Sequence, residues 1–99
     1  MVTVIVRHRV KDYDAWKPVF DDHGDVRRKH GSLGHQLYRA TDDPNMVIVV
    51  NHFRDAAGAQ AFAADPSLPA AMQRGGVEGA PDLALCEQVE SVDHPLAVG

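Results

Sequence analysis

The 99-residue sequence contains one cysteine and no apolar run long enough to cross a membrane. Cys86 has no second cysteine for an internal disulfide, so a reducing compartment is the simplest expectation and we predict a cytoplasmic protein. The longest apolar runs, Val2–Val6 and Met46–Val50, are far shorter than the roughly 20 residues of a transmembrane helix. No secretory signal pattern precedes the first strand-like segment. We therefore expect no membrane partner.

Positive charge is also scarce. Lysine and arginine total 10 against 14 aspartates and glutamates, which gives a formal net charge of −4. A nucleic-acid-binding protein needs a basic face that replaces phosphate counterions, and the sequence has no such stripe. The one basic run, Arg27-Arg28-Lys29, lies at the end of an expected helix, where cations complement the helix dipole. We therefore expect no nucleic-acid partner.

The residues that are present predict four strands in one globular domain. Hydrophobic residues make up 44 % of the chain and charged residues 24 %, as in ordinary soluble domains. Val2–His8 and Met46–Phe53 are apolar almost throughout, which is typical of strands buried on both faces. Leu33–Thr41 alternates between two faces, and Leu83–Val92 is the last predicted strand. Asp42–Asn45 is a strong turn signal, so the second and third strands should form a hairpin.

Helical spacing of apolar residues predicts a helix within Asp12–His30. Asp12 or Asp14 can cap its first turn, and Gly31 is placed to end it in a left-handed cap. Pro18 is unfavourable in a helix interior, so we expect the main helix to start or bend there.

The second helical region lies between the third and fourth strands. Asp55 is expected to cap a helix over Ala56–Ala64, and Ser67 a short one over Leu68–Arg74. Gly79–Pro81 is expected to be a loop before the last strand.

The resulting order, β-α-β-β-α-β, predicts an α+β fold: a ferredoxin-like domain over residues 1–92 with a four-stranded antiparallel sheet and a tail over residues 93–99. In that topology the first and third strands are central. Both are apolar on two faces, but helices can cover only one face of the sheet. A second copy of the chain is the economical cover for the other face, so we expect a homodimer.

Four strings carry a resemblance to a known family. They are HRVKDYDAWKPVFDDH, YRATDDPN, FRDAAGAQAF and AAMQRGGV. With the element order, they make residues 1 to about 92 resemble the dimeric α+β barrel superfamily, and within it the antibiotic-biosynthesis monooxygenase group. The resemblance implies a homodimer whose helix–sheet pocket binds a flat phenolic or polyketide substrate. The implied enzyme deprotonates this substrate, and the carbanion reacts directly with oxygen without a cofactor.

The same superfamily leaves other functions open, because fold does not fix function. It includes polyketide cyclases, so a cyclase is a second form of the enzyme hypothesis. A non-catalytic small-molecule-binding or stress-associated dimer is the main alternative, and a haem- or metal-binding member is the third. The residue types that the oxygenase branch uses are present at Trp16, Tyr38, Arg39 and Asn51.

His23 and Arg27 form an (i, i+4) pair on the helix stripe that also carries Trp16 and Phe20. A histidine beside a fixed cation is disfavoured in its charged form, so His23 is a candidate neutral base. Arg27 is then a candidate for holding a substrate enolate or carboxylate. The competing interpretation is a hydrogen-bonded histidine at a helix edge with a solvated arginine. Trp16 and Phe20 would shape the pocket or simply belong to the core.

The predicted hairpin brings further histidines together. With a four-residue loop at Asp42–Asn45, His35 faces His52 on one side of the sheet, and His30 lies near the same end. We expect an acid–base or hydrogen-bonding role for His52, or a structural cross-strand pair. No paired motif supports a metal site, so we predict none.

Two further side chains complete the candidate set. Arg39 shares a face with Leu37 and needs a partner, either a carboxylate across the dimer or a ligand anion. Cys86 has no evident base nearby and is expected to be an inert thiol.

Overall fold

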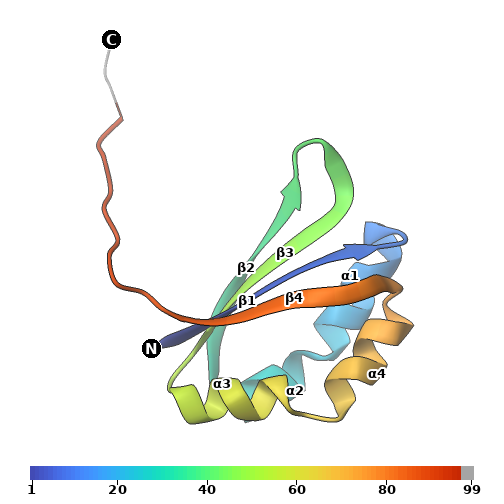
Figure 1. Cartoon of the computed structure of the whole chain (residues 1–99), viewed down its shortest axis with the longest axis horizontal. Coiled ribbons are helices and arrows are strands. Elements are labelled where there is room, and N and C mark those ends of the chain that lie inside the picture. Colours follow the sequence, from blue (N-terminus) through green and yellow to red (C-terminus); the bar gives the residue numbers. More distant parts are fainter. Residues whose placement is uncertain (97–99) are drawn as a thin grey trace.

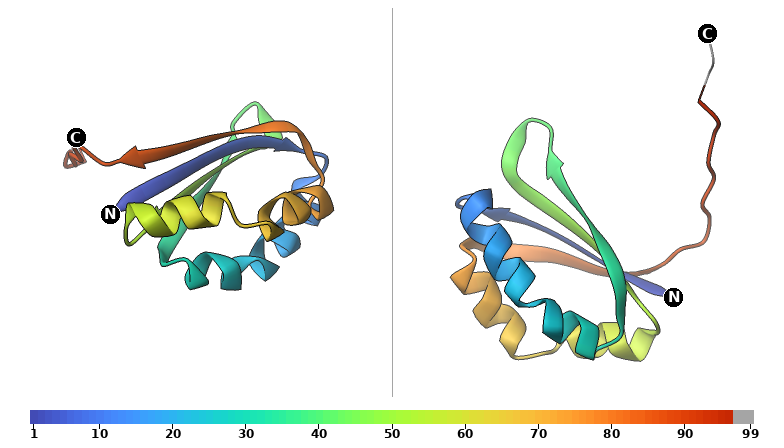
Figure 2. Two further views of the ribbon diagram at one scale, coloured as in Figure 1. Left: turned by 60° about the horizontal axis from the view of Figure 1, so that its bottom comes forward. Right: turned by 180° about the vertical axis from the view of Figure 1, so that it is seen from behind.

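The computed structural model describes residues 1–96. An antiparallel sheet in the order β2-β3-β1-β4 is covered on one face by the helices (Figures 1 and 2). The elements, in chain order, are β1 (Val2–Val10), α1 (Tyr13–Asp22), α2 (Gly24–Lys29), β2 (Ser32–Ala40), β3 (Asp43–Phe53), α3 (Ala56–Ala63), α4 (Ser67–Arg74) and β4 (Val77–Glu87). The predicted ferredoxin-like architecture is confirmed, with β1 and β3 in the centre and a pair of helices in each crossover.

The first helical region breaks at His23 and not at Pro18. α1 runs through Pro18, whose missing amide leaves only the carbonyl of the exposed Asp14 without its helical partner. His23, with φ −81° and ψ 0°, ends α1 and begins α2. Asp12 caps α1 by accepting from the Asp14 amide, as predicted.

The caps of the second helical region are partly as predicted. Asp55 accepts from the Gly58 amide at 2.7 Å and caps α3. Ser67, however, is the first residue of α4, and its amide donates to Asp65 Oδ1 at 2.8 Å. The predicted capping role of Ser67 is wrong, because the N-cap position of α4 is Pro66 and Ser67 already lies inside the helix.

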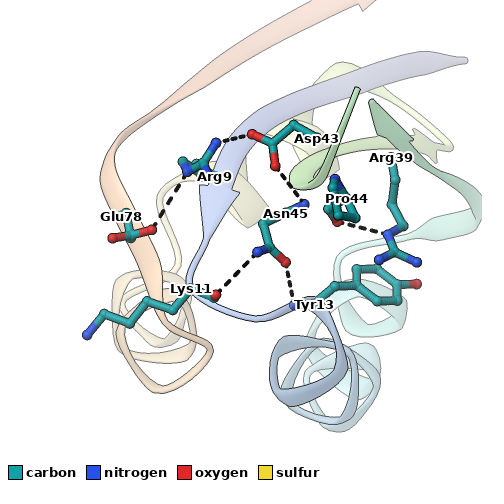
Figure 3. A network of polar contacts seen from close by, with 8 residues as sticks. All are labelled: Arg9, Lys11, Tyr13, Arg39, Asp43, Pro44, Asn45 and Glu78. Atoms are coloured by element: carbon teal, nitrogen blue, oxygen red, sulfur yellow. Dashed lines mark hydrogen bonds and ion pairs between the residues drawn. The ribbon is translucent and has the colours of Figure 1, made fainter. Parts of the chain in front are cut away.

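The predicted register of the β2–β3 hairpin is wrong by one residue. Ala40 pairs with Asp43 across a two-residue turn, and Arg39 pairs with Val47, so β3 carries three extra residues, 44–46. The Asn45 side chain holds this excess in place: it accepts from the Tyr13 amide at 3.0 Å and donates to the Lys11 carbonyl at 3.4 Å (Figure 3). Hydrogen bonds between residues far apart in the chain can thus give a register other than the one that the turn residues predict.

The changed register separates two histidines that were predicted to face each other. His35 lies opposite Asn51, and His52 lies opposite Gly34. Because side chains alternate between faces of a strand, His35 and His52 lie on opposite sides of the sheet.

β4 starts and ends earlier than predicted. The segment Gly79–Pro81, expected as a loop, is a bulge inside the strand, where the register with β1 shifts between Arg7 and Arg9. A bulge accommodates Pro81, which has no amide for the ladder. β4 ends at Glu87 because that residue pairs with Val2, the first residue of β1. Residues 88–96 carry no helix or strand and lead away from the sheet (Figure 1); residues 97–99 of the predicted tail lie outside the described residues.

The core lies between the helices and one face of the sheet. Val4 and Val6 of β1, Val47 and Val49 of β3, and Phe62 of α3 are buried there. On the other face, Ile5 of β1 and Ile48 and Val50 of β3 remain partly exposed, and Tyr38 of β2 is exposed. Within residues 1–96, no helix is long and apolar enough to span a membrane.

Candidate functional site

A cavity of about 50 Å³ lies between the sheet and helices α1, α2, α3 and α4. Apolar side chains form most of its wall, and the polar ones come from four places in the chain. These polar residues are His8, His23, Arg27 and Asn51. Trp16 and Phe20 line the same cavity, so five of the predicted site residues meet here: Trp16, Phe20, His23, Arg27 and Asn51.

His8 is the cavity residue that the sequence reasoning missed. It is only 6 % exposed, and its Nδ1 is buried with no hydrogen-bond partner among the described residues. Burial lowers the pKa of His8, so the ring is neutral at neutral pH. A buried polar atom without a partner is costly, and its place beside a cavity marks a position where a ligand would interact. The sequence pattern that could have identified His8 is its two-residue spacing from Val6 and Val4, which places all three on one face of a strand.

Arg27 brings a positive charge to the cavity without a matching carboxylate. Its side chain is buried at 6 % exposure, Nη2 donates to the Phe20 carbonyl at 2.8 Å, and the guanidinium lies 3.8 Å from the centre of the Phe20 ring. Within the described residues, no carboxylate lies within salt-bridge distance of it. Burial lowers the pKa of Arg27 to about 10, which still leaves it charged at neutral pH. A buried cation without an ion-pair partner suits an anionic ligand.

His23 stands at the α1–α2 junction with one ring nitrogen fixed. Nε2 lies 2.8 Å from Ser67 Oγ at the start of α4. Burial, and next the positive charge of Arg27, lower the pKa of His23, so its neutral form is favoured, as the sequence predicted. A neutral imidazole next to a cation can accept a proton from a bound acid.

Asn51 and the aromatic side chains define the rest of the site. Asn51 is 2 % exposed, and its Oδ1 accepts from Ser32 Oγ at 2.8 Å, which leaves its amide group as a donor. Trp16 stacks on Phe20 with ring centres 4.9 Å apart, and His8 meets the edge of Trp16 at 5.6 Å. The arrangement can accept a proton from a flat acid and hold the resulting anion.

Several solved structures share the fold of this chain. No protein-family model and no curated protein matches the chain. SnoaB, a cofactor-independent oxygenase from Streptomyces nogalater, superposes with a TM-score of 0.75 at 17 % identity, over 94 % of this chain and 97 % of its own. A Nitrosomonas europaea protein named for the antibiotic biosynthesis monooxygenases has a TM-score of 0.69 at 16 % identity, over 91 % of this chain and 100 % of its own. A Caulobacter crescentus protein with the same family name has a TM-score of 0.71 at 19 % identity, over 90 % of each chain. This chain has the antibiotic biosynthesis monooxygenase fold.

Other predicted site residues lie outside the cavity. His52 is on the open face of the sheet, where Nδ1 lies 3.0 Å from Thr3 Oγ1 and Nε2 lies 2.7 Å from Gln36 Oε1. Tyr38 is on the same face and 54 % exposed. Neither side chain can reach a ligand in the cavity across the sheet.

Arg39 and His35 lie on the helix side but beyond the cavity. Arg39 finds its partners within the chain: Nε donates to the Pro44 carbonyl at 2.8 Å, and the guanidinium lies 4.1 Å from the Tyr13 ring centre (Figure 3). His35 meets the edge of Phe20 at 5.0 Å and borders a second cleft of about 300 Å³, which Arg27 also lines. Arg27 therefore lies between the cavity and this outer cleft and lines both.

The predicted convergence of three histidines is wrong. His30 Nε2 lies 2.8 Å from Asp65 Oδ2, whereas His35 and His52 lie on opposite faces of the sheet. In residues 1–96, no group of three or more histidine, cysteine, aspartate or glutamate side chains is placed to hold a metal ion. Cys86 is a half-buried free thiol on β4.

Proposed function

We propose that this protein is a cofactor-independent monooxygenase that acts on a small, flat, aromatic enolate or phenolate. The single observation that carries the proposal is Arg27, a buried cation without a carboxylate partner, beside two neutral histidines and stacked aromatic rings. An enzyme that stabilises a delocalised anion needs this combination of fixed charge, base and dry, flat walls. The structural likeness to SnoaB supports the same class.

Each residue then has a defined role. Arg27 holds the enolate oxygen of the substrate, and His23 accepts the proton from an acidic CH2 at the other end of the ring system. Trp16 and Phe20 orient the plane of the rings. The Asn51 amide and the His8 imidazole supply further hydrogen bonds to substrate oxygen atoms.

The reaction needs no external electron source. The carbanion bonds to one atom of O2 to give a hydroperoxide, which loses water as the carbon becomes a carbonyl. The substrate loses four electrons and O2 gains four, so one oxygen atom enters the product and the other leaves as water. The substrate therefore supplies every electron that oxygen needs.

The size of the substrate is limited by the cavity and by the neighbouring outer cleft. The cavity, at about 50 Å³, is smaller than the roughly 150 Å³ of an engineered cavity that binds benzene. The outer cleft of about 300 Å³ shares Arg27 with the cavity. We propose that the substrate enters through this cleft and that the flexible Met72 side chain in the cavity wall shifts to admit its reacting ring.

We also propose that the working unit is a homodimer whose sheets pack through their open faces. Ile5, Ile48 and Val50 stand on that face, from the two central strands, and no described element covers them. Tyr38 and His52, which the cavity excludes, belong to this interface. A reducing, cytoplasmic location is proposed on the basis of the single free Cys86.

The decisive experiment measures oxygen uptake with two probes, anthrone and 1-naphthol. We expect enzyme-dependent O2 consumption and one atom of 18O2 in the quinone product, with most of the rate lost in Arg27→Gln. Binding of a probe without O2 uptake would overturn the oxygenase and favour the alternative, a non-catalytic binding dimer. A cyclase would change a polyketide-like probe without O2. Absorbance spectra and elemental analysis of the purified protein test the haem- or metal-binding alternative.

A further inference from the structure

We propose that His30, Asp65 and Ser67 form a hydrogen-bonded relay that fixes the tautomer of His23 and leaves His23 Nδ1 as the proton acceptor of the site. The inference deepens the proposed function, on which the role of His23 as a base depends. Ser67, Asp65 and His30 are positioning residues in it, since they act on the ligand only through His23.

The four side chains form a continuous chain of short contacts. His30 Nε2 lies 2.8 Å from Asp65 Oδ2, Ser67 Oγ lies 2.6 Å from Asp65 Oδ1, and His23 Nε2 lies 2.8 Å from Ser67 Oγ. The chain joins the α1–α2 junction and the end of α2 to the α3–α4 junction. It is shielded from water: His23 is 6 % exposed, and the side chains of His30 and Asp65 are 17 % and 13 % exposed.

The direction of each hydrogen bond follows from proton counting. Two oxygen atoms at 2.6 Å need a proton between them, and this proton must come from Ser67, because its hydroxyl has one and an ionised carboxylate has none. Asp65 is ionised, since its hydrogen bonds from His30 and then Ser67 hold the pKa of that carboxyl far below its usual range. With its only proton committed to Asp65, Ser67 Oγ accepts from His23, so Nε2 of His23 carries the ring proton.

The other nitrogen of His23 is then the basic one. Nδ1 has no hydrogen-bond partner within residues 1–96, and the ring lines the cavity. When Nδ1 takes a proton from a ligand, the resulting imidazolium is stabilised through Ser67 by the carboxylate of Asp65. In many enzymes a third group orients the catalytic base. Here Asp65 would orient His23, with Ser67 between them.

The charged groups around His23 shift its pKa in opposite directions. Arg27 on α2 and Arg74 on α4 lower the pKa of His23, and Asp65 in the α3–α4 connection raises it. The relay therefore offsets part of the effect of the two arginines. Burial and the two arginines keep His23 neutral in the free protein, whereas the relay helps it to hold a proton during the reaction.

The competing explanation is that Asp65 and Ser67 serve only to start α4. Asp65 Oδ1 also accepts from the Ser67 amide at 2.8 Å, which is a capping contact. Ser67→Ala separates the two explanations, because alanine keeps this amide and loses only the hydroxyl. Ser67→Thr restores a hydroxyl and serves as the matched rescue.

The test is nitrogen-15 NMR of the histidine rings in the full-length protein, with His23 assigned from the signal that His23→Gln removes. We expect the Nε2–H tautomer in the wild type, a mixture of tautomers and a lowered pKa of His23 in Ser67→Ala, and recovery in Ser67→Thr. Circular dichroism of Ser67→Ala should show an unchanged helix content. An unchanged tautomer and an unchanged pKa of His23 in Ser67→Ala would overturn the relay.

Enzyme activity is a second measurement, and it can contradict the oxygenase and the relay independently. In Ser67→Ala we expect kcat to fall about tenfold or more with KM nearly constant, since general-base catalysis contributes about 10²–10⁴-fold. Wild-type protein that shows the NMR signature but no oxygen uptake contradicts the oxygenase and leaves the relay supported. Oxygen uptake with a wild-type rate in Ser67→Ala contradicts the relay and leaves the oxygenase supported.

Discussion

His35 and Asn51 lie directly opposite each other on β2 and β3, and both belong to the face of the sheet that the helices cover. A shift of one residue would have placed His52 on the helix side and Asn51 on the open side. The register of one hairpin therefore decides which polar side chain enters the cavity. Asn45, three residues beyond the turn, sets it through its contacts with the Lys11 carbonyl and the Tyr13 amide.

Replacing Arg27 with glutamine should weaken the binding of anionic ligands without unfolding the protein. The guanidinium makes no ion pair among the described residues, and its stacking on Phe20 can be replaced in part by the glutamine amide. A charge-assisted contact to a ligand contributes about 1.5–3 kcal/mol, so the Kd of a phenolate probe should rise roughly 10- to 150-fold. Titration calorimetry measures this change.

The matched control for Arg27 is its exposed neighbour. Arg28→Gln removes the same charge at the next position, where the side chain is 70 % exposed and pairs with Asp25. We expect its phenolate affinity to stay within about twofold of the wild type. An equal loss in both variants would show that net charge, and not the cavity, attracts the ligand.

His8→Phe should stabilise the protein while impairing its ligand binding. Phenylalanine keeps a ring against the edge of Trp16 and removes the buried Nδ1 that has no partner in the described chain. The cost of such an atom is about 1–3 kcal/mol, so a gain of about 1 kcal/mol and a higher Tm are expected. Denaturant and thermal melts measure the gain. A destabilised variant would instead show that the histidine is satisfied in solution.

Stability should fall as the pH drops below about 6.5. Burial lowers the pKa of both His8 and His23, so the folded protein binds protons less readily than the unfolded chain. The sign follows directly: stability is complete above the unfolded histidine pKa of about 6.5 and is lost as pH falls through the folded values. Asp65 adds a loss only below about pH 4, where unfolded aspartates take up protons. Urea melts across this range should show a smaller pH dependence in His8→Phe.

The sequence predicted the strands and their order because β1 and β3 have apolar residues on both faces, a pattern that few other structures produce. It also placed Trp16, Phe20, His23 and Arg27 on one stripe, since helical spacing survives the break at His23. The hairpin register and the role of Ser67 depend on contacts between residues far apart in the chain, which no local pattern encodes. His8 was missed for another reason: it stands between Arg7 and Arg9 near the end of the strand, so nothing local sets it apart as a cavity residue.

Gly58→Ala should destabilise the protein, although this substitution usually stabilises a helix. An alanine Cβ at this position in α3 would overlap the carbonyl oxygen of His30 at the end of α2. We expect a loss of about 2 kcal/mol or more, because backbone must move to relieve the overlap. Ala61→Gly, at an exposed position of the same helix, is the control and should cost only about 1 kcal/mol. A stabilised Gly58→Ala would show that α2 and α3 are less closely packed in solution.

Ile48→Lys should separate the proposed dimer into folded monomers. Ile48 stands on the open face of the central strand β3, between Arg7 of β1 and Tyr38 of β2. In a face-to-face dimer a lysine here would bury an unpaired charge next to Arg7, a cost of several kcal/mol that only dissociation avoids. In a monomer the same lysine is solvated, so the fold should survive. Sedimentation equilibrium should give about twice the 10.8 kDa chain mass for the wild type and the mass of one chain for Ile48→Lys. The control Gln60→Lys, at an exposed position of α3, should remain dimeric. A wild type that stays at 10.8 kDa at high concentration would contradict the dimer, and the open face would then need a different partner.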